Sequence, residues 1–206
     1  MKLICVGGLS SGCGKTSVAC LLLKALPGWA AMKVTPSRPQ EVCARGKDCG
    51  ACSPPDGEYE VALDEEIPAR PRKATTRFAE VGASHVAFVR ALPEHLPAAL
   101  EAALARLSGA PGVIVESTTI MPLVDGLRIL VAREGMSEVK DSARAAVEFV
   151  DLFVVNRERD AEGSVGDAWP ALGDPGDRRI TACAALPPEH PRNRELVERC
   201  VRYGAT

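Results

Sequence analysis

The sequence predicts an α/β protein with a doubly wound, mainly parallel β-sheet, and two observations support this fold class. Short runs of Val, Ile, Leu and Ala alternate along the chain with helical patterns, which is the order of a parallel sheet with helices on both faces. Aromatic residues make up only 4% of the chain, which fits the aliphatic core of buried parallel strands. In such a sheet, ligands bind outside the carboxyl ends of the strands.

Size and charge narrow the class of protein further. The 206 residues fit a single domain spanning 1–206. With 25 Lys and Arg against 27 Asp and Glu, the net charge is −2, so neither nucleic acid nor a membrane surface is an expected partner. The apolar runs are too short to span a bilayer, and no leader pattern precedes the first strand. We therefore expect a cytoplasmic protein whose eight Cys are reduced.

The first third of the chain predicts a strand, a glycine-rich turn, a helix and a second strand. Residues 2–6 form an apolar run that ends in two glycines, and residues 15–26 carry apolar side chains at helical spacing. Residues 29–34 predict the second strand. The regular pattern then disappears over 36–72, a segment rich in Pro, Cys and charge, which we interpret as an irregular Cys-rich insertion. Such long irregular segments are usually functional.

The remainder alternates regularly between strands and helices. Pro93 opens one helical pattern and Gly109 closes it. A loop rich in Gly and Asp, 162–177, separates the last two predicted strands. The predicted strands are 85–89, 112–116, 127–131, 152–155 and 179–183, and the predicted helices are 73–81, 94–107, 139–149 and 193–203.

The turn between the first strand and the first helix has the composition of a phosphate-binding loop. Glycines let backbone N–H groups turn towards phosphate oxygens, and the following helix directs the positive end of its dipole at them. Lys15 would reach the β- and γ-phosphates, and the hydroxyl of Thr16 would bind Mg²⁺. Leu9 stands where the usual pattern has Gly, so the loop is a variant. The candidate nucleotide-binding residues are Gly12, Cys13, Gly14, Lys15, Thr16 and Ser17.

Two charged residues end strands at the edge of the sheet where this loop lies. Glu116 follows four apolar residues, which favours a role as the second Mg²⁺ ligand, acting with Lys15 in catalysis, over a solvated carboxylate. Lys33 ends the second strand, where it would bind phosphate or an anionic substrate, although a surface lysine is an equal reading. Asn156 ends a later strand and suits a contact with the edge of a nucleotide base, with the loop 184–191 closing over the ring.

Together these motifs resemble the molybdopterin-guanine dinucleotide biosynthesis adaptor (MobB-type) family of P-loop proteins, and more widely the dethiobiotin synthetase-like group. The resemblance covers roughly 1–160 and depends on 11–16, Lys33, Val115-Glu116 and the helix–strand stretch 76–89. It implies a P-loop fold, ATP or GTP with Mg²⁺, slow NTP hydrolysis, a homodimer, and a client metalloenzyme or cofactor-biosynthesis protein. Ser117 replaces the glycine that the synthetase carries after its strand-end Glu, which argues against dethiobiotin synthesis.

Three cysteines in the insertion form a metal-ligand pattern. Cys43, Cys49 and Cys52 are spaced C-x5-C-x2-C, and the C-x2-C pair lets two thiolates converge on one ion. Both an iron–sulfur cluster and Zn²⁺ accept such ligands. Cys183 or a second subunit would supply the fourth ligand. The alternative is a trio of redox-active or incidental thiols.

These features lead to one main hypothesis of function and two alternatives. The main one is a P-loop NTPase of MobB type that assists maturation of a metalloenzyme or of the molybdenum cofactor, with a metal or iron–sulfur site in the Cys loop. A dethiobiotin synthetase-like ATP-dependent ligase, with Lys33 binding substrate, is the first alternative. A metal-binding or redox module is the second. The sequence does not decide between adenine and guanine as the nucleotide base, because Arg159 occupies the position of the acid in the guanine-binding pattern of GTPases.

Overall fold

A computed structural model describes residues 1–37, 55–67, 73–135, 138–159 and 176–206 of the chain. Within these residues, eight strands form one sheet in the order β3-β4-β2-β5-β1-β6-β7-β8. Every pairing is parallel except that of β3 with β4. The α/β class and the mainly parallel sheet predicted from the sequence are confirmed, and this architecture is compatible with a P-loop-like fold.

The elements follow the predicted alternation closely. The 139–149 pattern gives a shorter helix, α4, followed by a single 3₁₀ turn. The strands are β1 (Lys2–Gly8), β2 (Ala30–Pro36), β3 (Tyr59–Leu63), β4 (Val86–Ala91), β5 (Gly112–Glu116), β6 (Leu127–Arg133), β7 (Leu152–Asn156) and β8 (Arg179–Ala182). The helices are α1 (Lys15–Ala25), α2 (Ala74–Glu80), α3 (Leu96–Arg106), α4 (Asp141–Ala146) and α5 (Arg194–Ala205).

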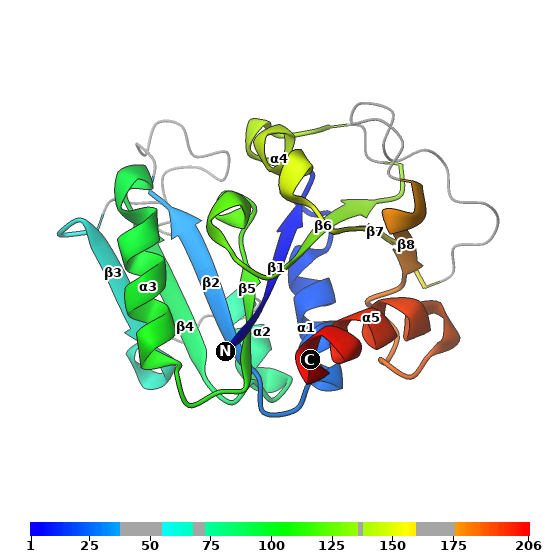
Figure 1. Ribbon diagram of the computed structural model, residues 1–206, viewed down its shortest axis with the longest axis horizontal. Helices are drawn as coiled ribbons and strands as arrows, with labels where there is room; N and C mark the ends of the chain where they lie inside the picture. Colours follow the sequence, from blue (N-terminus) through cyan, green and yellow to red (C-terminus); the bar gives the residue numbers. More distant parts are fainter. Residues whose placement is uncertain (38–54, 68–72, 136–137, 160–175) are drawn as a thin grey trace.

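Two hydrophobic cores lie on opposite faces of the sheet. Apolar residues of α3 and α4 pack on one face, and those of α1, α2 and α5 pack on the other (Figure 1). Side chains along the central strands alternate between the two cores, as the twofold period of a strand requires. In β5, for example, Val113 and Val115 join the α3 side and Ile114 joins the α1 side. Glu116, two residues after Ile114, is therefore on the α1 side.

The order of the strands places the ends of β1 and β5 at a reversal of the chain path. From β1 the chain moves outward through β2 to β4, returns to insert β5 between β2 and β1, and then continues on the other side with β6. Helix α1 connects β1 to β2. Such reversal points form the ligand crevice of open α/β sheets. The glycine-rich turn, Lys33 and Glu116 all lie at the carboxyl edge of the sheet, next to this reversal point.

The described part of the segment expected to be irregular includes the strand β3. Tyr59–Leu63 pairs antiparallel with β4 at the edge of the sheet, with Val61 opposite Val89. Its pattern is weak in the sequence because an edge strand is only partly buried and flanked by charge. The edge is held by Arg90 bonding Glu60, and by Arg106 of α3 donating to the carbonyl of Val61 at 2.9 Å. Tertiary pairing therefore creates a strand that local periodicity does not signal.

No helix among the described ranges is long and apolar enough to cross a bilayer.

Candidate functional site

The glycine-rich turn leaves β1 and enters α1 through two left-handed residues. Gly12 has a φ of 77° and Gly14, the N-cap of α1, has a φ of 96°; residues with a Cβ rarely adopt such angles. Leu9 does not need this freedom. Its side chain is buried in the α3-side core, and its N–H donates to the carbonyl of Val131 at 2.9 Å. The variant position is thus explained by packing, and the conformational demand for glycine falls within 12–14.

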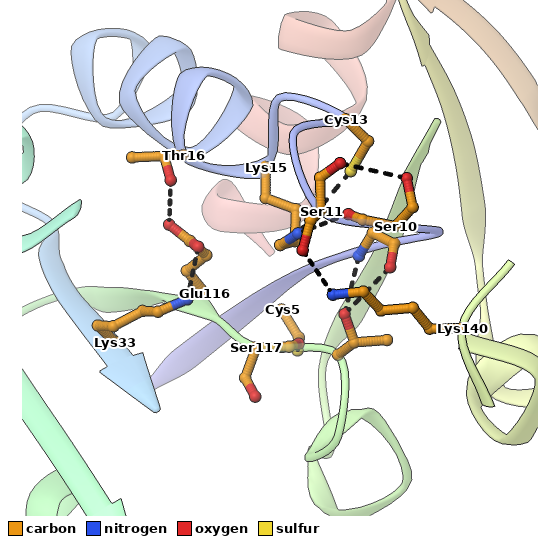
Figure 2. Close-up of polar contacts among 12 residues, drawn as sticks. Cys5, Ser10, Ser11, Cys13, Lys15, Thr16, Lys33, Glu116, Ser117 and Lys140 are labelled. Carbon is orange, nitrogen blue, oxygen red and sulfur yellow. Dashed lines mark hydrogen bonds and ion pairs between the residues drawn. The ribbon is translucent and has the colours of Figure 1, made fainter. Parts of the chain in front are cut away.

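Lys15 turns back over the loop that precedes it. Its Nζ donates to the carbonyl of Ser10 at 3.1 Å and lies 3.8 Å from the Sγ of Cys13 (Figure 2). These partners are neutral, and among the described residues no carboxylate forms an ion pair with Lys15. The loop therefore surrounds a positive charge that is not neutralised within the described chain, at the amino end of an 11-residue helix whose dipole has the same sign.

Thr16, Lys33 and Glu116 meet at the mouth of this loop. The hydroxyl of Thr16 donates to Glu116 Oε2 at 2.7 Å, and Lys33 Nζ forms an ion pair with Glu116 Oε1 at 2.6 Å. Lys33 and Glu116 are register partners in the parallel pairing of β2 with β5, and α1 covers the same face. Figure 2 shows both donors directed at the carboxylate from separate elements.

Two of the three groups, Thr16 and Glu116, are of the kind that binds a divalent cation. The Glu116 side chain is only 3% exposed, and a buried carboxylate requires charge or hydrogen-bond partners. Lys33 and Thr16 satisfy that requirement here. Carboxylate and hydroxyl oxygens are also the ligand types that Mg²⁺ prefers, usually with several waters retained. Thr16 and Glu116 therefore fit a magnesium ion, and Lys33 adds a second positive charge next to it.

The segment after Glu116 supports the end of β1. Thr118 Oγ1 accepts from the N–H of Gly8 at 2.9 Å and lies 3.3 Å from the Gly8 carbonyl. Ser117 is buried, and its carbonyl accepts from the Cys5 thiol at 3.3 Å. A Cβ on Gly7 would collide with Met121 and come within 3.1 Å of Thr118 Cα. The segment that begins at Ser117, where the synthetase has glycine, thus packs closely against the strand that leads into the phosphate loop.

Asn156 connects the phosphate loop to the loop after β8. Its Nδ2 donates to the carbonyl of Cys13 at 3.4 Å, and its Oδ1 accepts from the N–H of Ala184 at 3.0 Å. A Cβ on Gly14 would overlap Asn156 Nδ2, which gives a second reason for glycine at that position. Within the described ranges these bonds use one amide hydrogen and one oxygen lone pair of Asn156, which leaves one of each for a ligand. Ser17 faces elsewhere, because Arg77 of α2 donates to its Oγ at 3.2 Å.

A fully buried Asn193 shapes the loop that Asn156 touches. Its Oδ1 accepts from the Cys183 N–H at 2.8 Å. Its Nδ2 is 3.1 Å from the Cys183 carbonyl, 3.2 Å from that of Leu186 and 3.0 Å from that of Pro187. Several backbone groups of the loop are thus satisfied by one side chain from the segment before α5. This arrangement sets the loop conformation next to the predicted base position.

The predicted metal site combines three cysteines of the insertion with Cys183 as a candidate fourth ligand. Cys43, Cys49 and Cys52 lie outside the described residues. Cys183, the candidate fourth ligand, is fully buried. Among the described residues, no group of three His, Cys, Asp or Glu side chains could hold a metal ion. Cys13 is buried as well, and a Cβ on Gly8 would collide with its sulfur.

The sequence predicts site roles for Lys15, Thr16, Lys33, Glu116 and Asn156, and in the structure all five lie in or next to the phosphate loop at the carboxyl edge of the sheet. The sequence does not predict the roles of Thr118 and Lys140, which contact the phosphate loop or the strand leading into it, or of Asn193, which holds the neighbouring loop. Thr118 is 110 positions from Gly8 along the chain, and Lys140 is 129 positions from Ser11. Asn193 acts by bonding backbone groups of the loop after β8. Nothing local in the sequence marks any of the three; Asn193, for example, stands between two arginines in a polar stretch.

Comparison of the chain with family models, with curated proteins and with solved structures finds no match. The arguments about function therefore depend on the chemistry of this site.

Proposed function

We propose that this protein is a P-loop NTPase that binds ATP or GTP together with Mg²⁺ and hydrolyses it slowly. The observation that carries the proposal is that Thr16 and Lys33 both bond the buried Glu116 carboxylate. They do so beside a phosphate loop whose own Lys15 has neutral partners. A phosphate chain would supply the missing negative charge. A structural turn would need neither a buried carboxylate at its mouth nor two lysines around it.

The chain's own residues account for each part of binding. Backbone N–H groups of 12–16, at the amino end of α1, would cradle the phosphates. Lys15 would exchange the Ser10 carbonyl for phosphate oxygens. Thr16 and Glu116 would hold Mg²⁺, which when bound neutralises charge on the β- and γ-phosphates. Lys33 would keep a positive charge beside Glu116 throughout.

The base would lie beside Asn156 and the loop that starts at Ala184. Support comes from the hydrogen bond that joins them and from the contact of Asn156 with the phosphate loop. The distance between the phosphates and the base is thereby set by one side chain. Asn156 offers both a donor and an acceptor, which suits either purine, so the choice between ATP and GTP is left to measurement.

The biological role that we propose is that of a MobB-type adaptor, which assists maturation of a metalloenzyme or of the molybdenum cofactor. This part rests on the sequence resemblance of 11–16, Lys33 and Val115-Glu116. It carries with it a homodimer, a client protein, and a metal or iron–sulfur site at Cys43, Cys49 and Cys52.

A ligase that phosphorylates a small carboxylate is the second candidate. Lys33 favours it, since its side chain is 24% exposed and its ammonium lies beside the proposed magnesium position, where an anionic substrate would be activated. The two candidates differ in turnover. Hydrolysis without an added acceptor fits the NTPase, whereas phosphate release that depends on a carboxylate substrate fits the ligase.

The direct test is nucleotide binding by titration calorimetry with and without Mg²⁺. Lys15→Ala should weaken ATP and GTP binding at least roughly tenfold, since charge-assisted hydrogen bonds to phosphate are lost. The matched control is Lys24→Ala, an exposed lysine in the last turn of the same helix, which should leave binding unchanged. Normal nucleotide binding by Lys15→Ala, or no binding by the wild-type protein, would refute the proposal.

A further inference from the structure

A second lysine contacts the phosphate loop from a distant part of the chain. Lys140 Nζ donates to the hydroxyl of Ser11 at 2.9 Å, across 129 positions of sequence. Ser11 is the loop residue that follows Ser10, whose carbonyl binds Lys15. Figure 2 shows Lys15 and Lys140 reaching Ser10 and Ser11 from different directions. Two ammonium groups therefore approach the same two-residue segment.

The backbone holds Lys140 at this position. The N–H of Lys140 donates to the carbonyl of Leu9 at 2.9 Å, and the N–H of Leu9 in turn donates to Val131 of β6 at 2.9 Å. Lys140 is also the N-cap of α4, whose Ala143 and Ala146 are buried in the core. The main chain at 140 is thus tied directly to the phosphate loop. Lys140 is nevertheless an exposed residue.

We propose that Lys140 is a second phosphate-binding cation of the nucleotide site, contacting the phosphate chain from the outer side of the loop. The proposal rests on the nucleotide binding proposed above and adds a residue to it. A hydroxyl is a weak partner for an ammonium, whereas a phosphate oxygen forms a shorter and stronger charge-assisted bond. The Ser11 hydroxyl positions Lys140 for that exchange, as the Ser10 carbonyl does for Lys15. The ligand class is an oligophosphate group.

Lys140→Gln separates charge from contact, because glutamine can still donate to Ser11 but carries no charge. The experiment measures affinities for Mg-ATP, Mg-GTP and inorganic tripolyphosphate by calorimetry at several salt concentrations. Lys140→Gln should weaken all three by roughly tenfold and make affinity less dependent on salt, since one phosphate-contacting charge is gone. Lys140→Arg should restore most of the affinity. Lys24→Gln, an exposed lysine away from the loop, is the matched control.

The outcomes distinguish this inference from the proposed function. If Lys15→Ala abolishes nucleotide binding while Lys140→Gln binds all three ligands as the wild type does, the role of Lys140 is refuted and the phosphate loop stands. If neither the wild type nor any variant binds, both are refuted. A loss in Lys140→Gln that Lys140→Arg does not recover, with unchanged salt dependence, would show a purely structural contact and overturn the inference.

Discussion

Lys33 Nζ and Glu116 Oε1 lie 2.6 Å apart on adjacent parallel strands, where they are register partners. The second oxygen of the same carboxylate accepts from Thr16, the residue after the phosphate-loop lysine. One buried acid thus connects β2, β5 and α1 at the carboxyl edge of the sheet. A change in the charge of any one of these three residues should therefore affect the other two.

Replacing Glu116 with Gln should uncouple magnesium from nucleotide. The amide oxygen can still accept from either Thr16 or Lys33, but the amide nitrogen cannot accept from the other, and the side chain lacks the charge that attracts a divalent cation. Addition of Mg²⁺ should then improve nucleotide affinity by less than about twofold, against a larger gain in the wild type. Calorimetric titrations in Mg²⁺ and in EDTA measure the difference. Glu101→Gln, on the exposed face of α3, is the control; an unchanged magnesium effect in Glu116→Gln would exclude this carboxylate as a ligand.

Replacing Lys33 with Met should destabilise the protein and make its stability depend on magnesium. The change leaves a carboxylate that is 3% exposed without its cation, which should cost about 2–4 kcal/mol of unfolding free energy. Because Mg²⁺ would partly replace the ammonium, adding it should stabilise Lys33→Met more than the wild type. Urea denaturation with and without Mg²⁺ measures both effects. Equal stability of variant and wild type would show that the ion pair contributes nothing.

Asn193→Ala should loosen the base-side loop while leaving phosphate binding intact. The substitution leaves backbone groups of 183–187 without the amide that now bonds them, at a cost of about 1–3 kcal/mol. Hydrogen exchange at Ala184 and Leu186 should accelerate. Affinity for tripolyphosphate should stay within about twofold of wild type while affinity for ATP and GTP falls. A parallel loss for tripolyphosphate would mean that Asn193 supports the whole fold rather than the loop.

Three buried thiols should resist alkylation and lower the alkaline stability of the protein. Burial raises the pKa of Cys5 to about 12, of Cys20 to about 11 and of Cys200 to about 12, from an ordinary 9.0. A folded protein at about pH 8 should therefore leave all three unmodified by iodoacetamide, because the thiolate is the nucleophile. Mass mapping of alkylated peptides with and without denaturant is the measurement. Rapid labelling of these sites in the native state would contradict it.

The same pKa shifts set the direction of a pH effect on stability. The unfolded chain releases these protons above its ordinary thiol pKa of 9.0, whereas the folded state holds them until pH 11–12. Unfolding is therefore favoured progressively as pH rises through this window. Cys20→Ala should reduce the slope of unfolding free energy against pH there. An identical slope in the variant would show that Cys20 does not contribute.

Much of the site was predictable because its parts lie at the ends of recognisable elements. The turn at 8–17 joins an apolar strand to a helical pattern, and Glu116 and Lys33 each close a strand. Parallel strands direct their carboxyl ends to one edge, so these residues were expected to meet. The sequence alone determined the α/β class, the order of most elements and this convergence.

Only the tertiary structure decided the partners of each residue. Register between β2 and β5 sets Lys33 opposite Glu116, and the edge of β4 turns Tyr59–Leu63 into a strand. Lys140 and Asn193 reach the site through contacts that no local period encodes. The physical reason is that periodicity reports which face of an element is buried, whereas lateral register and loop packing depend on elements far away in the chain.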